Sequence, residues 1–124
     1  MARGIGSTVI LQMIESGDIT LVSSLVLAYE NSRNPFPHRK KWVSDCLNLA
    51  GHTQPADEEI WMRAEEMEQQ GLKAIDALHL ACAEAAHADY FITCDDEVIR
   101  RYREERTKGI NPVDFVMIAT KGRD

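Results

Sequence analysis

The chain has 124 residues, of which 44% are apolar, and its 20 acidic and 14 basic residues give a formal charge of −6. This length and composition predict one compact domain, residues 1–124, and argue against a disordered chain. No apolar run approaches the roughly 20 residues of a membrane span, and no signal-peptide pattern opens the chain, so we expect a cytoplasmic protein. The acidic balance argues against a protein that coats nucleic acid through its overall charge.

The first part of the chain predicts two helices around a short strand. Val9 to Glu15 has a helical apolar face and is followed by Gly17, a usual helix-stop residue. Ile19 to Val22 is an apolar run rich in branched side chains, which is typical of a buried strand. Ser23 or Ser24 can cap the next helix, whose inward-facing residues are predicted to be Leu25, Val26 and Tyr29.

The middle of the chain predicts three helices. They run from His38 to Ala50, from Asp57 to Gln70 and from Ile75 to Ala86. The second has Ile60, Trp61, Ala64 and Met67 at core spacing, and the third is apolar nearly all round, so it should lie inside the domain. Gly51 to Gln54 is a weak strand candidate.

The last part predicts a strand from Tyr90 to Thr93 and then a basic helix, capped by Asp95 or Asp96, that runs to about Thr107. Lys108 to Ile110 is a second weak strand candidate. Asn111 and Pro112 then open a final helix through Ala119. Helices that alternate with short apolar strands predict an α/β fold with a parallel sheet covered on both faces. Such a sheet would need another strand in its middle.

Three acidic residues suggest a site. Asp76 opens the apolar helix, Asp95 follows a strand at its carboxyl end, and Glu30 comes from a distant helix. Carboxylates that converge repel one another and need a cation, and oxygen ligands select hard ions such as Mg²⁺ or Mn²⁺. Such an ion is sufficient for phosphodiester hydrolysis. The alternative is an ordinary α/β scaffold in which the aspartates only cap helices.

Several other residues have a structural interpretation first. The three cysteines, Cys46, Cys82 and Cys94, have no zinc-site spacing and are predicted to be small core residues. His79, one turn after Asp76, is expected to be a hydrogen-bonded core histidine in preference to a catalytic base. Glu84 and Asp89 are expected to face solvent.

Two sequence blocks resemble a known family. Ile75 to Ala81 reads I-D-A-L-H-L-A and Ala88 to Asp96 reads A-D-Y-F-I-T-C-D-D, and together they resemble the second half of a PIN domain. Ser23 to Pro35 resembles the helix that carries the family's glutamate. The resemblance implies a three-layer α/β/α domain that binds Mg²⁺ or Mn²⁺ and cleaves RNA, as in the VapC-type toxins of toxin-antitoxin pairs.

Carried over residue by residue, the resemblance assigns Glu30, Asp76 and Asp95 as catalytic, metal-binding acids. Thr93 would orient a carboxylate or water, and Asp96 is an alternative ligand that is more easily explained as a helix cap or first-turn acid. The basic residues Arg33, Lys40 and Lys41 are candidates to hold RNA. An antitoxin protein is a possible partner.

The resemblance also implies a missing part, because the family's first strand, which is central in the sheet and ends in an aspartate, has no counterpart here. Unpaired strand edges favour association, so we expect a homo-oligomer, or a sheet completed by Gly4 to Leu11 in an extended form. The loss of one acid weakens metal binding, so a PIN-like module that binds protein or RNA without cleavage is the alternative function. A nucleotide-binding domain is disfavoured because the chain has no glycine-rich phosphate loop.

Overall fold

The structure is a computed structural model that describes residues 5–103 and 106–121. In this part of the chain seven helices alternate with four short strands, in the order α1 (Ile5–Glu15), β1 (Val22–Ser24), α2 (Leu25–Ser32), α3 (Pro37–Leu47), β2 (His52–Gln54), α4 (Glu58–Gln69), α5 (Ala74–Ala85), β3 (Tyr90–Ile92), α6 (Asp96–Arg101), β4 (Lys108–Ile110) and α7 (Pro112–Lys121). The predicted α/β class is confirmed. None of the described helices is long and apolar enough to cross a membrane.

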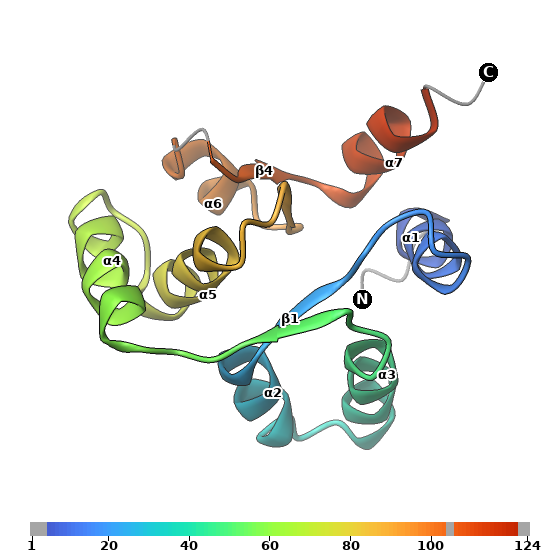
Figure 1. Cartoon of the computed structure of the whole chain (residues 1–124), viewed down its shortest axis with the longest axis horizontal. Helices are drawn as coiled ribbons and strands as arrows, with labels where there is room; N and C mark the ends of the chain where they lie inside the picture. The colour runs from blue at the N-terminus through green and yellow to red at the C-terminus, as the bar shows by residue number, and fades with distance from the viewer. Residues whose placement is uncertain (1–4, 104–105, 122–124) are drawn as a thin grey trace.

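The strands form two separate parallel pairs. β1 pairs with β2 in the register Val22 to His52, and β3 pairs with β4 in the register Tyr90 to Lys108. Figure 1 shows the first pair beside α2 and α3 and the second pair beside α6 and α7. Parallel pairing was predicted, and both weak strand candidates are strands. In the described residues, however, no strand joins the two pairs into one sheet.

The first strand lies slightly later in the chain than its apolar run predicts. It spans Val22–Ser24, because the residues that form the strand are determined by pairing with β2 and not by the apolar run alone. Ser23 and Ser24 are therefore buried strand residues. Ser24 also caps α2 as predicted, since its hydroxyl accepts a hydrogen bond of 3.0 Å from the Leu27 amide.

The basic helix after β3 is shorter than predicted. α6 ends at Arg101 and does not reach Thr107. Thr107 is fully buried, and its hydroxyl donates a hydrogen bond of 2.7 Å to the carbonyl of Ala88. This contact and the pairing of Lys108 with Tyr90 require an extended chain here, and tertiary pairing overrides the helical pattern.

The N-terminal segment does not complete the sheet. Residues 5–15 form α1, which confirms the helix predicted from Val9 and excludes an extended form for residues 5–11; Gly4 lies outside the described residues. α1 packs against α7. The chain leaves α1 through Gly17, whose φ of 82° lies in the left-handed region that glycine adopts without strain.

The core is centred on α5, which packs against α4. Met67 and Leu80 are fully buried, and Ile60, Ala64 and Ala77 complete the contact. Three residues predicted to face inward are instead exposed, because they lie on faces of α2 and α4 that no described element covers: Leu25 at 56%, Tyr29 at 63% and Trp61 at 54%. Cys82 is buried as predicted, and burial raises the pKa of its thiol, whereas Cys94 is exposed.

Glu84 is a correction, because it is buried and does not face solvent. Its carboxylate accepts a hydrogen bond of 2.8 Å from Arg63 Nε of α4 and another from the hydroxyl of Tyr102. Burial raises the pKa of Glu84, but the hydrogen bonds from Arg63 and Tyr102 outweigh burial, so its pKa lies below the ordinary value of 4.5. This network ties α4, α5 and the end of α6 together.

We predict that Glu84→Gln destabilises the fold by about 1.5–3 kcal/mol near neutral pH, because it replaces the charged acceptor of the Arg63 and Tyr102 hydrogen bonds with a neutral one. A carboxyl group whose pKa is lowered by folding contributes stability that is fully present above pH 4.5. This contribution is lost as the pH falls through the lower pKa of the folded protein. The difference between wild type and variant, measured by urea unfolding, should therefore shrink in acid.

Glu66→Gln is the matched control, since Glu66 pairs with the same Arg63 but its side chain is 64% exposed. It should cost about 0.5 kcal/mol or less. Equal losses of unfolding free energy in the two variants would contradict a special role for the buried pair of Arg63 and Glu84.

Candidate functional site

A groove of about 960 Å³ lies between the two strand pairs. It is lined by residues of the inner strands β1 and β3, whereas the outer strands β2 and β4 contribute none of its described lining. Helices α1, α5 and α7 supply most of the remaining walls. Glu30 and Asp76, two of the three predicted acids, line this groove.

Glu30 is joined to α5 through His79. The Nε2 atom of His79 lies 3.3 Å from Oε1 of Glu30, and the side chains are 13% and 51% exposed respectively. His79 is thus hydrogen-bonded, as predicted, but its partner is one of the candidate ligands. The contact orients the Glu30 carboxylate toward the face of α5 that carries Asp76, because residues three apart on a helix are neighbours with Cβ atoms about 5–6 Å apart.

Asp76 lies in the first turn of α5 without capping it. The N-cap residue of this helix is Lys73, which makes no side-chain capping bond. Within residues 5–103 and 106–121, the half-buried Asp76 carboxylate has no hydrogen-bond or ion-pair partner. The capping explanation for Asp76 therefore fails.

Asp95 lies apart from the other two acids. It is the N-cap of α6, where its Oδ1 accepts a hydrogen bond of 2.9 Å from the Glu97 amide, and it is absent from the described lining of the groove. Thr93 lines the groove, and its hydroxyl accepts a hydrogen bond of 3.1 Å from the Asp95 amide. Asp96 is exposed in the first turn of α6, so Asp95, and not Asp96, is the cap.

The described residues offer close to the smallest number of carboxylates with which proteins commonly bind a hard divalent ion. Among the described residues no group of three or more histidine, cysteine or acidic side chains could hold a metal. Mg²⁺ is nevertheless commonly bound through one or two carboxylates, with waters and substrate phosphates as the remaining ligands. Glu30 and Asp76, which line the same groove, are the two carboxylates that could serve as such ligands.

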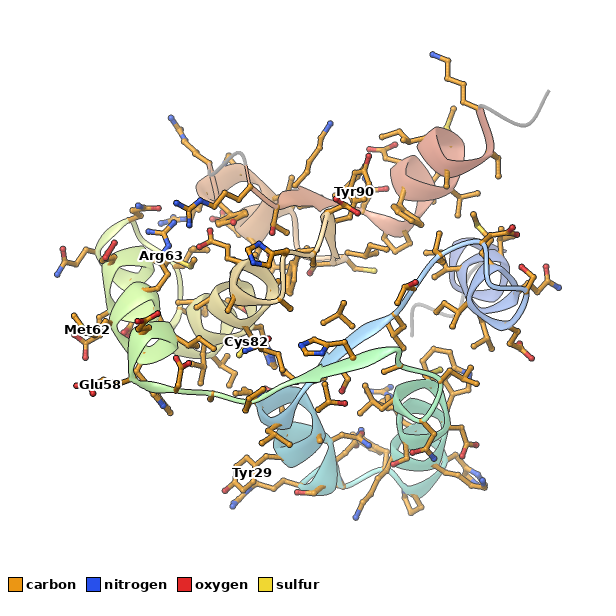
Figure 2. All side chains as sticks on the ribbon, in the orientation of Figure 1. Tyr29, Glu58, Met62, Arg63, Cys82 and Tyr90 are labelled. Carbon is orange, nitrogen blue, oxygen red and sulfur yellow. The ribbon has the colours of Figure 1, made fainter. Side chains whose placement is uncertain are left out.

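The predicted RNA-binding residues lie on and after α2. Arg33 ends α2, and its guanidinium donates a hydrogen bond of 3.1 Å to the hydroxyl of Tyr29. Lys40 and Lys41 are exposed on α3, where Lys41 pairs with Asp45 at 3.1 Å. Sequence reasoning missed the exposed Tyr29, which points away from the body of the protein in Figure 2. An exposed aromatic ring beside an arginine is a common surface for stacking nucleic-acid bases.

The comparisons with known proteins identify the family. The model of the PIN domain family matches residues 19–105, which is more than half of the 124 residues, and the chain belongs to the PIN domain family. PIN domains have a nuclease-type fold, generally depend on divalent metals and act on RNA. Neither the curated proteins nor the solved structures gave a match.

Two substitutions at Asp95 separate its capping role from a role as ligand. Asparagine caps helices about as well as aspartate, so Asp95→Asn should leave stability nearly unchanged, whereas Asp95→Ala should cost about 1 kcal/mol in urea unfolding. Asp95→Asn should nonetheless weaken Mn²⁺ binding if this acid joins the site. Unchanged Mn²⁺ affinity in Asp95→Asn would restrict Asp95 to capping.

Proposed function

We propose that this protein is a Mg²⁺- or Mn²⁺-dependent endoribonuclease of PIN type, with Glu30 and Asp76 as its metal-binding acids and Asp95, which lies outside the described lining of the groove, as the candidate third acid. The observation that carries the proposal is the half-buried Asp76 carboxylate, which has no partner in the described structure and shares a groove with Glu30. Two carboxylates on one groove, one of which is hydrogen-bonded to His79, are more stable with a bound cation than without one.

The chain's own residues would position the ion and the RNA. Glu30 and Asp76 supply oxygen ligands, and His79 holds the Glu30 carboxylate in place. Thr93 fixes the backbone that carries Asp95. A divalent cation held there would make water more acidic and offset negative charge on the scissile phosphate.

RNA contact is assigned to the surface next to Glu30. Arg33 lies one turn after Glu30 on the same helix end, and Lys40 and Lys41 follow on α3. These side chains can neutralise phosphates, and Tyr29 can stack on an unpaired base. The substrate is therefore single-stranded RNA.

The location, domain bounds, cellular role and assembly of the protein are inferred from the same family membership. We infer a cytoplasmic protein whose residues 1–124 form one PIN-like domain, acting as the toxin of a toxin-antitoxin pair and assembling as a homo-oligomer. Its support is the PIN family match together with the two unpaired strand edges.

Cleavage of a fluorescent single-stranded RNA in the presence of Mn²⁺ tests the proposal. Asp76→Asn and Glu30→Gln should each lower the rate by about a hundredfold or more, since each removes a ligand charge from the site. Glu68→Gln makes the same charge change on the exposed face of α4 and should leave the rate unchanged. Equal rates for wild type and Asp76→Asn would show that the activity belongs to a contaminant.

A second function, binding without cleavage, is favoured by the lack of a three-ligand group among the described residues. Calorimetric titration with Mn²⁺ separates the two functions. The nuclease requires a bound ion whose affinity falls in Asp76→Asn. A protein that binds RNA but takes up no Mn²⁺ would be the binding module.

A further inference from the structure

The corner where α2 meets α3, residues 29–41, is a positively charged surface on an acidic protein. Figure 1 shows the two helices side by side, joined by a short connection. The corner carries four side chains that are cationic at neutral pH: Arg33, Arg39, Lys40 and Lys41. Lys41 pairs with Asp45, whereas the other three form no ion pair with another described residue. This local excess of positive charge is the reverse of the overall charge of −6.

Two exposed aromatic rings lie in the same corner, and an arginine contacts each of them. Tyr29 is 63% and Phe36 is 58% exposed. The guanidinium carbon of Arg33 lies 5.9 Å from the centre of the Tyr29 ring, and that of Arg39 lies 5.1 Å from the centre of the Phe36 ring. Significant contacts of this kind occur roughly once per 70–80 residues, so two of them within residues 29–39 are a local concentration.

Side-chain amides hold the corner in one conformation. Asn31 is buried, and its Nδ2 atom donates hydrogen bonds of 3.0 Å to the carbonyl of Lys40 and 3.1 Å to the hydroxyl of Ser44, so it fastens α2 to α3. The side-chain oxygen of Asn34 accepts a hydrogen bond of 3.0 Å from the Phe36 amide. The backbone that carries both rings is therefore ordered before any ligand arrives, which lowers the entropic cost of binding.

The charge around the rings identifies the ligand. Exposed rings can cover an apolar protein surface or stack on nucleic-acid bases, but unpaired cations beside them favour a polyanion. Aromatic rings and guanidinium planes are the two kinds of side-chain surface on which unpaired bases stack. In a duplex the bases already stack on one another, so a ligand that uses these rings has to be single-stranded.

We propose that Phe36 and Arg39 form a second base-stacking position beside Tyr29 and Arg33, so that the corner holds two unpaired bases of the RNA. Stacking uses the π-face that every base has, so the corner selects single strands over duplexes without reading base identity. The choice of RNA as the ligand rests on the proposed function, whereas stacking itself requires neither a metal ion nor cleavage. Phe36 is thus assigned as a residue that determines substrate specificity.

The first test measures binding of the full chain to single-stranded RNA that contains 2-aminopurine, in EDTA. The wild type should quench the fluorescence, because stacking on a ring quenches this base. Phe36→Leu should weaken binding about tenfold, since it keeps an apolar side chain but removes the ring, and Phe36→Trp should bind as the wild type does. Trp61→Leu makes a similar change on α4, where Trp61 is 54% exposed, and should have no effect. Equal affinities of wild type and Phe36→Leu would overturn the proposal.

The second test separates stacking from charge attraction alone. A surface that only attracts phosphates binds duplex and single-stranded RNA alike, so the ratio of the two affinities reports the rings. The wild type should bind the single strand about tenfold more tightly than a duplex of the same sequence, and Phe36→Leu should narrow this ratio. The same ratio in both proteins would show that Phe36 does not select single strands.

Cleavage kinetics in Mn²⁺ distinguish failure of this proposal from failure of the proposed function. Phe36→Leu should raise KM about tenfold and leave kcat unchanged, because the ring binds the substrate and the transition state equally. A protein that stacks bases in EDTA but cuts no RNA would contradict the nuclease and leave the stacking position in place. A nuclease whose KM is unchanged in Phe36→Leu would contradict the stacking position alone.

Discussion

The structure depends on the burial of α5. This helix packs against α4 and also touches β1, β2 and β3, so it holds the two strand pairs that no described strand connects. Its side chains Ala77 and Leu80 are fully buried, and burial of one leucine stabilises a fold by roughly 1.5–3 kcal/mol. The Arg63 and Tyr102 bonds to Glu84 fasten the same helix from its polar side. The position of Asp76 and His79 follows from this constraint.

The division of the sheet has two consequences for function. It leaves a groove that is lined by residues of β1 and β3 and also by Glu30 and Asp76, so the candidate metal site and the inner strands border one space. It also separates Asp95, which follows β3, from the acids that lie near β1 and α5.

Much of the fold follows from local pattern, but the site does so only in part. Periodicity predicted α4 and α5, and capping chemistry predicted the starts of α2 and α7, because these signals lie within a few residues of each other. The buried state of Glu84 depends on Arg63, 21 residues away, and no local pattern contains it. The exposure of Tyr29 and Trp61 likewise depends on which elements fail to cover them. Asp76 was predictable from the sequence because a lone acid opens an apolar helix, whereas the pairing of Glu30 with His79 required the fold.

The central claim is that acids from α2 and α5 bind one divalent ion at the groove, and paramagnetic broadening by substoichiometric Mn²⁺ in amide NMR spectra of the full chain tests it most directly. The account predicts that the amides of Glu30, Asp76 and His79 broaden first, and that the broadening disappears in Asp76→Asn. Broadening confined to another acidic surface, such as Glu58 and Glu59 at the start of α4, would contradict it.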